Sequence, residues 1–458
     1  MAKKRIVLFI AIILFIFIVI WFIIGCPPFK KCPGTRNLSE PPPSKIILKV
    51  VGLWDSKADW KEIADKFREY KMKEENGYLD VIIEYHRVSD QFNYEDTVRE
   101  MQFEGDGPNI FMLFNPWVSR YHEKLLPIPK TMMNLPQFKN TFARVTIDDL
   151  TTPDGNIYAL PFYIDTPALY YNEDRFFNEN FPKAPETWDE FKDYVEKLTI
   201  LDENGNIENA GAAFGGGSNI NRNQDIIILL AMQNNFRRDS TKNIVSFNNP
   251  GSIAAIKFYT DFTDPANRFY TWNEDQIYSI DAFTQRKAAM MINYSHHMDN
   301  VISKTGGTLN FKVAPIPQLD KNYKVNYASY WVPVVPKIAP CRSESSKTDC
   351  YSLAWEFLNF AAKKENVRLY LDSTNRVAAN LQLAREQATN FDDARSVFAS
   401  QVFTAKSWKH SDDKTTDKAL VEMVDSIITE DESKKKTLRE AINIVKNNIR
   451  ALDEQIED

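Results

Sequence analysis

Apolar residues in the first part of the globular sequence alternate between two periods. Residues 45–54 form an almost continuous run of β-branched and aliphatic side chains, which is typical of a strand buried on both faces. Residues 60–70 repeat large apolar side chains at a helical spacing, residues 81–85 return to a strand pattern, and residues 94–103 are helical again. This alternation predicts a parallel or mixed sheet covered by helices, with a binding crevice beyond the carboxyl ends of its strands.

The longest apolar run precedes these elements. Three basic residues within the first five positions are followed, from Ile6 to Gly25, by about 20 uncharged and strongly apolar residues, enough to cross a bilayer as a helix. We therefore expect residues 1–25 to be a signal or transmembrane anchor, with the domain held outside the cytoplasm. Residues 26–44 hold six prolines and few apolar side chains, so we expect a stiff, extended spacer.

The chain has four cysteines. Cys26 ends the apolar run, and the order Ile-Ile-Gly-Cys at 23–26 resembles a bacterial lipobox, which would make Cys26 the lipidated residue. An uncleaved membrane anchor is the alternative, because the run is long and two prolines follow the cysteine. Cys341 and Cys350 flank a polar loop, and in an oxidising compartment we expect a local disulfide between them; two unpaired thiols are the alternative.

A distinctive order of elements lies between residues 154 and 191. Residues 154–176 read as a glycine-containing turn, an extended apolar run and a second extended run that ends in two tyrosines. We expect Thr187 to cap the helix that follows, and Glu190 to reach back to it as a capping box. The pattern therefore predicts two extended segments that lead into a helix.

The order of these motifs resembles the extracellular solute-binding proteins of the maltose-binding type. In that family, the stretch that matches residues 154–191 leaves one lobe, passes the ligand cleft and enters the other. Residues 105–109 resemble the family's turn before a short strand at the cleft, with Asn109 where aspartate is usual. Residues 282–296 resemble a second signature, with Arg286 where glycine is common.

The resemblance spans roughly residues 45–449 and implies an α/β fold with two lobes, the type II-like periplasmic-binding-protein fold, behind an N-terminal transmembrane or signal helix. We expect lobe 1 to consist of residues 45–160 and 294–345. We expect lobe 2 to consist of residues 161–293 and 346–458.

Composition excludes several other classes of function. The net charge of −6 leaves no basic surplus for neutralising phosphates, so we expect no nucleic-acid partner. No catalytic motif is visible, and the chain has only five histidines. His296 and His297 are adjacent, so on a strand they would point to opposite faces and could not bind one ion together. We therefore predict a non-enzyme without a metal or cofactor.

Aromatic, amide and charged residues gather at the predicted strand ends and loops. Aromatic faces stack on the apolar faces of sugars, while carboxylate, amide and guanidinium groups bind hydroxyl groups in bidentate fashion. For any single aromatic residue, packing in the core is the alternative. Because the family lines its cleft from these loops, we expect the ligand-binding residues to be Trp54, Asp55, Asn115, Trp117, Tyr163, Asp165, Ser218, Asn219, Tyr294, His296, Tyr330, Trp331, Arg376 and Trp408.

The resemblance implies a monomeric solute-binding protein of an ATP-driven ABC importer, anchored at the extracytoplasmic face of the cell membrane by its N-terminal helix or lipid. It would capture a small polar solute, a mono- or oligosaccharide, by hinge closure between its lobes, and an ABC permease would be its partner. Two alternatives stay open. One is a surface-tethered carbohydrate-active enzyme with paired carboxylates, and the other is a ligand sensor or adhesin without a permease.

Overall fold

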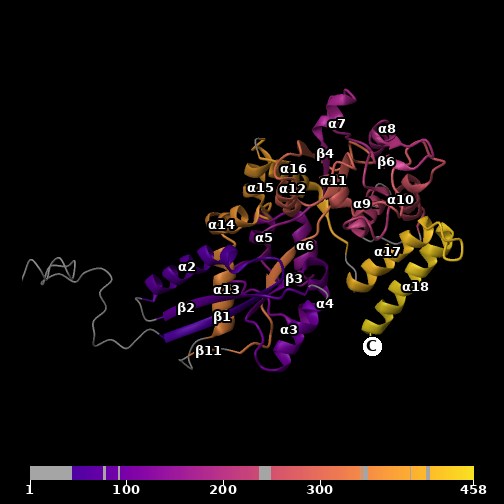
Figure 1. Cartoon of the computed structure of the whole chain (residues 1–458). Helices are drawn as coiled ribbons and strands as arrows, with labels where there is room; N and C mark the ends of the chain where they lie inside the picture. The colour runs from indigo at the N-terminus through magenta and orange to yellow at the C-terminus, as the bar shows by residue number, and fades with distance from the viewer. Residues whose placement is uncertain are drawn as a thin grey trace, which may run out of the picture.

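The computed structural model describes residues 44–75, 79–90, 93–236, 249–340, 342–343, 349–391, 393–408 and 413–457. The predicted anchor, Cys26 and nearly all of the predicted spacer lie outside these residues. Within the described part of the chain, no helix combines the length and the hydropathy that a membrane span requires. The described residues form two α/β regions, each with its own main sheet (Figure 1).

The first main sheet is built around β1 (Ser44–Gly52), whose apolar run is largely buried as predicted. β1 runs parallel to β2 (Leu79–Arg87) over its whole length and to β3 (Ile110–Phe114) near its carboxyl end. β10 (Trp331–Val334) pairs antiparallel with β3, and β11 (Arg342–Ser343) pairs antiparallel with β1. The mixed sheet predicted from the apolar pattern is therefore confirmed here.

Helices far apart in the sequence pack together beside this sheet. α2 (Lys57–Glu74) begins with a capping box between Ser56 and Asp59 and packs against β2. α13 (Cys350–Ala361) and α14 (Lys364–Thr374) both contact α2, and Figure 1 shows these orange helices next to the indigo one. The predicted division of the chain placed α13 and α14 in lobe 2, whereas they pack with the first sheet. The exact lobe boundaries stay a prediction.

The second main sheet is antiparallel and centres on β4 (Ala168–Asn172). β7 (Met290–Asn293) and β8 (Phe311–Ala314) flank it, and residues 210–213 form two parallel bridges at the outer side of β7. The helices of this part of the chain are α7 (Glu173–Asn178), α8 (Trp188–Leu198), α9 (Asn223–Phe236), α10 (Pro250–Thr260), α11 (Ser279–Thr284) and α12 (Met298–Thr305).

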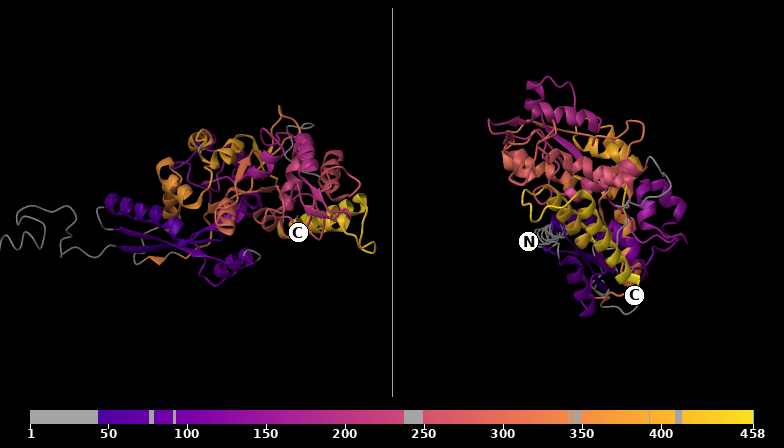
Figure 2. Two further views of the ribbon diagram at one scale, coloured as in Figure 1. Left: turned by 45° about the horizontal axis from the view of Figure 1, so that its top comes forward. Right: turned by 90° about the vertical axis from the view of Figure 1, so that its right-hand side faces the viewer.

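Two long helices follow near the C-terminus. α17 (Asp413–Ile428) contacts α9 and α10, and α18 (Leu438–Glu457) lies along α17 as the yellow pair in Figure 2. The remaining helices and strands are α3 (Tyr94–Phe103), α4 (Val118–Tyr121), α5 (Leu135–Thr141), α6 (Arg144–Leu150), α15 (Leu381–Ala388), α16 (Arg395–Gln401), β5 (Ile200–Leu201), β6 (Ile207–Asn209), β9 (Asn326–Tyr327) and β12 (Ala405–Lys406).

Residues 159–168, here called the crossing, connect the two sheets. The crossing is extended, as the sequence predicts, and it forms bridges with both flanking segments: Ala159 with Val334, Tyr163 with Ala378 and Asp165 with Ser329. The helix cap beyond it differs from the prediction. Thr187 accepts the Glu190 amide at 3.2 Å as expected, but the Glu190 carboxylate accepts the amide of Glu186 instead of closing a capping box with Thr187.

Cys350, the first residue of α13, is disulfide-bonded. This excludes the unpaired-thiol alternative for Cys350. Cys341 lies outside the described residues, so its pairing with Cys350 stays a prediction.

The turn after α11 keeps its geometry without glycine. Arg286 has a φ of +62°, in the left-handed region. Its amide donates to the Phe283 carbonyl at 3.0 Å, and the Lys287 amide donates to the Ala282 carbonyl at 2.8 Å, which is the Schellman pattern that usually has glycine at this position. The Arg286 guanidinium also donates to the Thr308 carbonyl at 2.7 Å. The departure from the family pattern therefore costs backbone strain and leaves the turn in place.

Replacing Arg286 by glycine should give a larger free energy of unfolding than replacing it by alanine, by about 1 kcal/mol. Both variants lose the hydrogen bond to Thr308, but only glycine adopts the left-handed backbone without strain. Urea unfolding followed by circular dichroism measures the difference. An alanine variant as stable as the glycine variant would show that the turn relaxes in solution.

Candidate functional site

The carboxyl-end edge of the first sheet and the adjoining edge of the second sheet carry most of the predicted ligand-binding residues. Trp54 and Asp55 follow β1, while Trp331 opens β10 opposite Phe114, the last residue of β3. On the second sheet, Asp165 lies just before β4, and the residues after Asn293 of β7 return to the same edge, because Ala168 pairs with Asn293. The fold thus brings residues from distant parts of the sequence to neighbouring strand ends.

The side chains at these edges form two groups. The polar cluster comprises Asp55, Tyr163, Asp165, Arg222, Asp225, Tyr294, Ser295, His296, Ser329 and Arg376. The aromatic cluster comprises Trp54, Tyr94, Phe114, Trp117 and Trp331.

A buried ion pair forms one side of the polar cluster. The Arg376 guanidinium donates to Asp55 at 2.8 Å and lies over the Tyr163 ring, 4.1 Å from its centroid. Asp55 also accepts hydrogen bonds from the Trp60 indole and the Tyr370 hydroxyl, both at 2.9 Å. Asp55 is 3% and Arg376 is 6% exposed. The charges of this pair are therefore already compensated within the protein.

Asp165 is a buried carboxylate with few partners. It is 7% exposed, accepts a long hydrogen bond of 3.3 Å from the Ser295 hydroxyl, and lies 3.9 Å from the Nδ1 atom of His296. Burial and, to a smaller extent, the charge of Asp55 raise the pKa of Asp165, and Arg376, Ser295 and Arg222 lower it only in part, so that the pKa is about 6. Ionised Asp165 is thus a strong acceptor that has few donors among the described residues.

A second ion pair holds the opposite side of the polar cluster. The Nε atom of Arg222 donates to Asp225 at 2.9 Å, and the Tyr294 hydroxyl donates to the same carboxylate oxygen at 2.6 Å. Arg222 has a φ of +57°, and its guanidinium also reaches the Ser329 hydroxyl at 3.4 Å. Sequence reasoning missed Arg222 and Asp225. The run of glycines just before them could have drawn attention to this loop.

His296 offers an exposed ring beside Asp165. Its side chain is 45% exposed, and its ring stacks on Tyr294 at 5.8 Å with an interplanar angle of 10°. Desolvation and then the charges of His297, Arg376 and Arg222 lower the pKa of His296, although its exposure limits the first of these effects. Desolvation, followed by Arg222 and Lys304, lowers the pKa of His297 to about 4. Both rings are therefore neutral at pH 7.

The aromatic cluster contains one exposed tryptophan on a packed base. Trp331 contacts Tyr94, Phe114 and Trp117 at centroid distances of 5.5–5.6 Å. Trp54 meets Trp331 edge to face at 6.4 Å and is 46% exposed, so its ring is available to a ligand.

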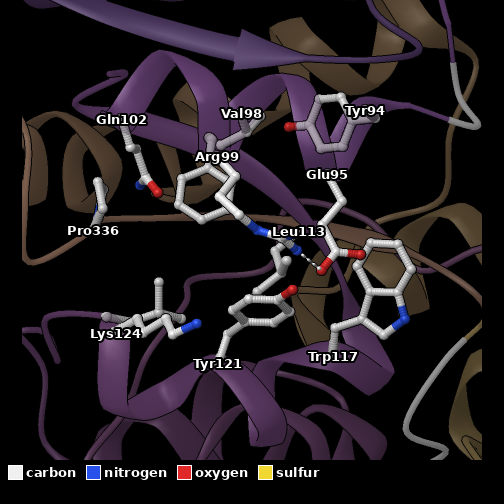
Figure 3. Close-up of a pocket in the computed structure, with 12 residues that line it drawn as sticks. Tyr94, Glu95, Val98, Arg99, Gln102, Leu113, Trp117, Tyr121, Lys124 and Pro336 are labelled. Atoms are coloured by element: carbon white, nitrogen blue, oxygen red, sulfur yellow. Dashed lines mark hydrogen bonds and ion pairs between the residues drawn. The ribbon is translucent and has the colours of Figure 1, made fainter. Parts of the chain in front are cut away.

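A small cavity lies under Trp117. Its walls come from α3 on one side and from Trp117, Tyr121 and Lys124 on the other, and the ion pair of Glu95 and Arg99, both on α3, points into it (Figure 3). Its volume is about 60 Å³. Because ligand pockets usually hold about 300–1,000 Å³, this cavity is too small to be the main binding site.

Several predicted site residues make structural contacts instead. Asn115 and Tyr330 are buried and both donate to Asp149, at 2.9 and 2.7 Å. Ser407 donates to the other oxygen of Asp149, and the neighbouring Trp408 is 4% exposed. Asn115, Tyr330 and Trp408 are thus buried, and their role in ligand binding stays a prediction.

The glycine-rich loop also serves packing. The Ser218 amide donates to Asp425 of α17 at 3.0 Å, and Asn219 accepts the Trp272 indole at 3.0 Å. A β-carbon at Gly217 would lie 1.9 Å from an Asp425 oxygen, which is why glycine is needed there. Ser218 and Asn219 thus bond to residues outside the polar cluster, and their role in ligand binding stays a prediction.

The clusters can bind polar organic groups but show no metal centre. Within the described ranges, no group of three or more His, Cys, Asp or Glu side chains could hold an ion. The arrangement supplies a carboxylate acceptor at Asp165, neutral imidazole at His296 and an exposed indole face at Trp54. These are groups that recognise hydroxyl-bearing or amine-bearing solutes.

Residues 62–396 match the family model for bacterial extracellular solute-binding proteins. The chain belongs to this family. The predicted family is therefore confirmed, and the match is to binding proteins rather than to enzymes.

Individual relatives are distant. The sn-glycerol-3-phosphate-binding periplasmic protein UgpB of Salmonella typhimurium is 25% identical over 248 residues, which cover 51% of this chain and 52% of that protein. The chain thus spans about half to three-fifths of the length of the curated relatives it matches.

Two solved structures establish the fold. One is a solute-binding protein of an ABC transporter from Thermotoga lettingae bound with α-D-tagatose (TM-score 0.62, 17% identity, covering 89% of this chain and 99% of that one). The other is the sugar-binding protein MalE from Xanthomonas citri (TM-score 0.68, 13% identity, 89% and 98% covered). The predicted two-lobed α/β fold is confirmed.

Replacing Trp331 by alanine should lower the free energy of unfolding by about 2–4 kcal/mol, because the ring packs against four other aromatic rings. The same change at Trp54 should cost less than about 1 kcal/mol, because Trp54 is half exposed. Urea unfolding of the two variants makes the comparison. Equal losses would show that Trp54 is packed in solution and does not offer an open face.

Replacing Asp165 by asparagine should raise the free energy of unfolding at pH 7.5 by about 2–3 kcal/mol and leave it nearly unchanged at pH 4. The pKa of about 6 in the folded protein lies above the ordinary value of 3.8. The folded protein therefore disfavours ionised Asp165. The free energy of unfolding that protonated Asp165 supports is fully present below pH 4 and is lost as the pH rises to 6.

The matched control for this experiment is Asp189→Asn, because the Asp189 side chain is 88% exposed and lies on the surface of α8. Its effect should stay within about 0.5 kcal/mol at both pH values. A stability gain at Asp165 that is the same at pH 4 and 7.5 would mean that ionisation of this carboxyl costs nothing.

Proposed function

We propose that this protein captures a small polar solute, a mono- or oligosaccharide, outside the cytoplasm and delivers it to an ABC permease. Two observations carry the proposal: an exposed indole, Trp54, follows a strand of the first sheet, and a buried carboxylate with few donors, Asp165, precedes a strand of the second. An indole face suits the apolar face of a sugar, and a carboxylate suits its hydroxyl groups.

Residues 329–331 support a single site because they link the two clusters. The Ser329 amide donates to the Asp165 carbonyl at 3.0 Å, and the Trp331 amide donates to the Tyr163 hydroxyl at 3.3 Å. A solute that stacks on Trp54 and bonds to Asp165 would therefore touch side chains from both sheets. Such a solute favours the arrangement in which both edges are close, which is binding by hinge closure.

The wider setting of the proposal comes from the sequence and from the neighbours in fold. Solved neighbours are named as sugar-binding proteins and as parts of ABC transporters, which supports a saccharide and a permease for this chain. The apolar N-terminal run supports attachment to the extracytoplasmic face of the membrane, through a helix or through lipidated Cys26. We further propose that the protein acts as a monomer.

The proposal predicts that a saccharide raises the melting temperature of the full chain in mild detergent, because a ligand specific for the native state stabilises it by mass action. A thermal-shift screen should include mono- and oligosaccharides, polyols, amino acids and short peptides, with chromatography of each mixture afterwards. A ligand recovered unchanged supports a binding protein, whereas a converted ligand would support the enzyme.

With that ligand, Trp54→Ala should weaken binding by about tenfold, which is the value of one good aromatic contact. The control is Phe103→Ala, since Phe103 is a 95% exposed aromatic at the end of α3 outside both clusters. Calorimetric titration measures the two affinities. Equal affinities in both variants would remove Trp54 from the site.

A further inference from the structure

We propose that the solute carries a positive charge: it is an amine-bearing saccharide whose ammonium group pairs with Asp165. This inference rests on the proposed function and specifies the substrate class of the same site. It follows from the charged groups that surround Asp165.

The two arginines of the polar cluster are both committed to other carboxylates. Arg376 pairs with Asp55 at 2.8 Å, and the two side chains are 8% and 3% exposed. Arg222 pairs with Asp225 at 2.9 Å, where the Asp225 side chain is 6% exposed. Each pair is close to neutral, so neither arginine supplies a full countercharge to a further anion.

Asp165 is the remaining charge. The charged groups that act on it are Asp55, Arg222 and Arg376, and Asp225 compensates Arg222. The two ion pairs cancel, and His296 and His297 are neutral at pH 7, so ionised Asp165 leaves the polar cluster with one uncompensated negative charge. An anionic solute would be repelled here, whereas a cationic solute would neutralise the cluster.

The contacts around Asp165 also suit an ammonium group, which has three donors and no acceptor. The Asp165 carboxylate has a single long hydrogen bond at one oxygen, from Ser295. The Ser295 hydroxyl can accept a second donor, and the neutral Nδ1 atom of His296 lies 3.9 Å from the other carboxylate oxygen. The exposed face of Trp54 would then stack on the sugar ring that carries the amine.

The cluster and the adjacent Asn293 have donors for the uncharged part of such a solute. The Nε atom of Arg376 and the Nδ2 atom of Asn293 are buried and have no hydrogen-bond partner among the described residues. Asn293 ends β7, one residue before Tyr294. Ring and hydroxyl oxygens of a saccharide are acceptors for such groups, so a charged amine and neutral oxygens are recognised by different members of one cluster.

The test compares three series that share a ring and differ in one group. The full chain in mild detergent is titrated by calorimetry at pH 7.5 with glucosamine and its β-1,4-linked oligomers, with the N-acetylated forms of the same compounds, and with glucose and cellobiose. Glucose 6-phosphate serves as the anionic probe. The amine series should bind at least tenfold tighter than the other two series, and the anion should bind most weakly.

The variant Asp165→Asn should bind the amine and neutral series within about threefold of each other, because it removes the charge and keeps the shape. The control Asp189→Asn removes the same charge at a remote, exposed position and should keep the wild-type preference. A preference that survives in Asp165→Asn would place the charge recognition elsewhere and overturn the inference.

The outcomes separate the inference from the proposed function. If the neutral or N-acetylated series binds as tightly as the amine series, the saccharide function stands and the charge inference is wrong. If none of the series binds, the saccharide function itself fails and the inference falls with it. If glucose 6-phosphate binds most tightly, Arg222 or Arg376 binds the ligand, and the inference of a positively charged solute is wrong.

Discussion

The buried pair of Asp55 and Arg376 is the interaction on which the rest of the site depends. It joins three segments that are distant in the sequence. Asp55 follows β1, Arg376 follows α14, and the Arg376 guanidinium also lies over the ring of Tyr163 in the crossing. A buried charge without its partner costs several kcal/mol, so these segments cannot separate cheaply. The pair therefore holds one side of the polar cluster in place.

Asp55 and Asp165 show how one residue type takes two roles. Asp55 has a guanidinium, an indole and a hydroxyl as donors, and it is a structural anchor. Asp165 is almost as buried, yet one serine hydroxyl 3.3 Å away is its only short contact among the described residues. Natural proteins tolerate such a destabilised group where function needs it. The difference between the two aspartates is therefore evidence for a ligand at Asp165.

Much of the fold could be predicted from local patterns. The apolar run of β1, the helical spacing of α3 and the extended crossing are properties of consecutive residues, and the structure has them nearly as predicted. The predicted capping box at Glu190 was wrong, because the Glu190 carboxylate accepts the backbone amide of Glu186 instead of that of Thr187. The packing of α13 and α14 on α2 was missed because it joins residues about 300 positions apart, which no periodicity reports.

The site was less predictable for the same reason. The strand-end rule selected Trp54 and Trp331, and the structure places these two rings in contact, but their role in ligand binding stays a prediction. The same rule also selected Tyr330, whose hydroxyl is bound to buried Asp149. Position along a strand does not reveal which face a neighbouring helix covers. Arg222 was missed because its importance comes from pairing with Asp225 and from a left-handed backbone, and neither is visible in composition.

Residues 329–331 connect the crossing to the first sheet. Tyr330 is fixed to the first sheet by its amide and carbonyl, which bond to Asn115, and by its hydroxyl. Ser329, one residue away, bonds instead to the crossing through its amide and to Arg222 through a side-chain contact of 3.4 Å. The two neighbouring residues therefore bond to different parts of the structure, Tyr330 to the first sheet and Ser329 to the crossing and Arg222. Because the Asp165 carbonyl accepts the Ser329 amide, the residue that we propose to bind the solute is tied through one short segment to the edge of the first sheet.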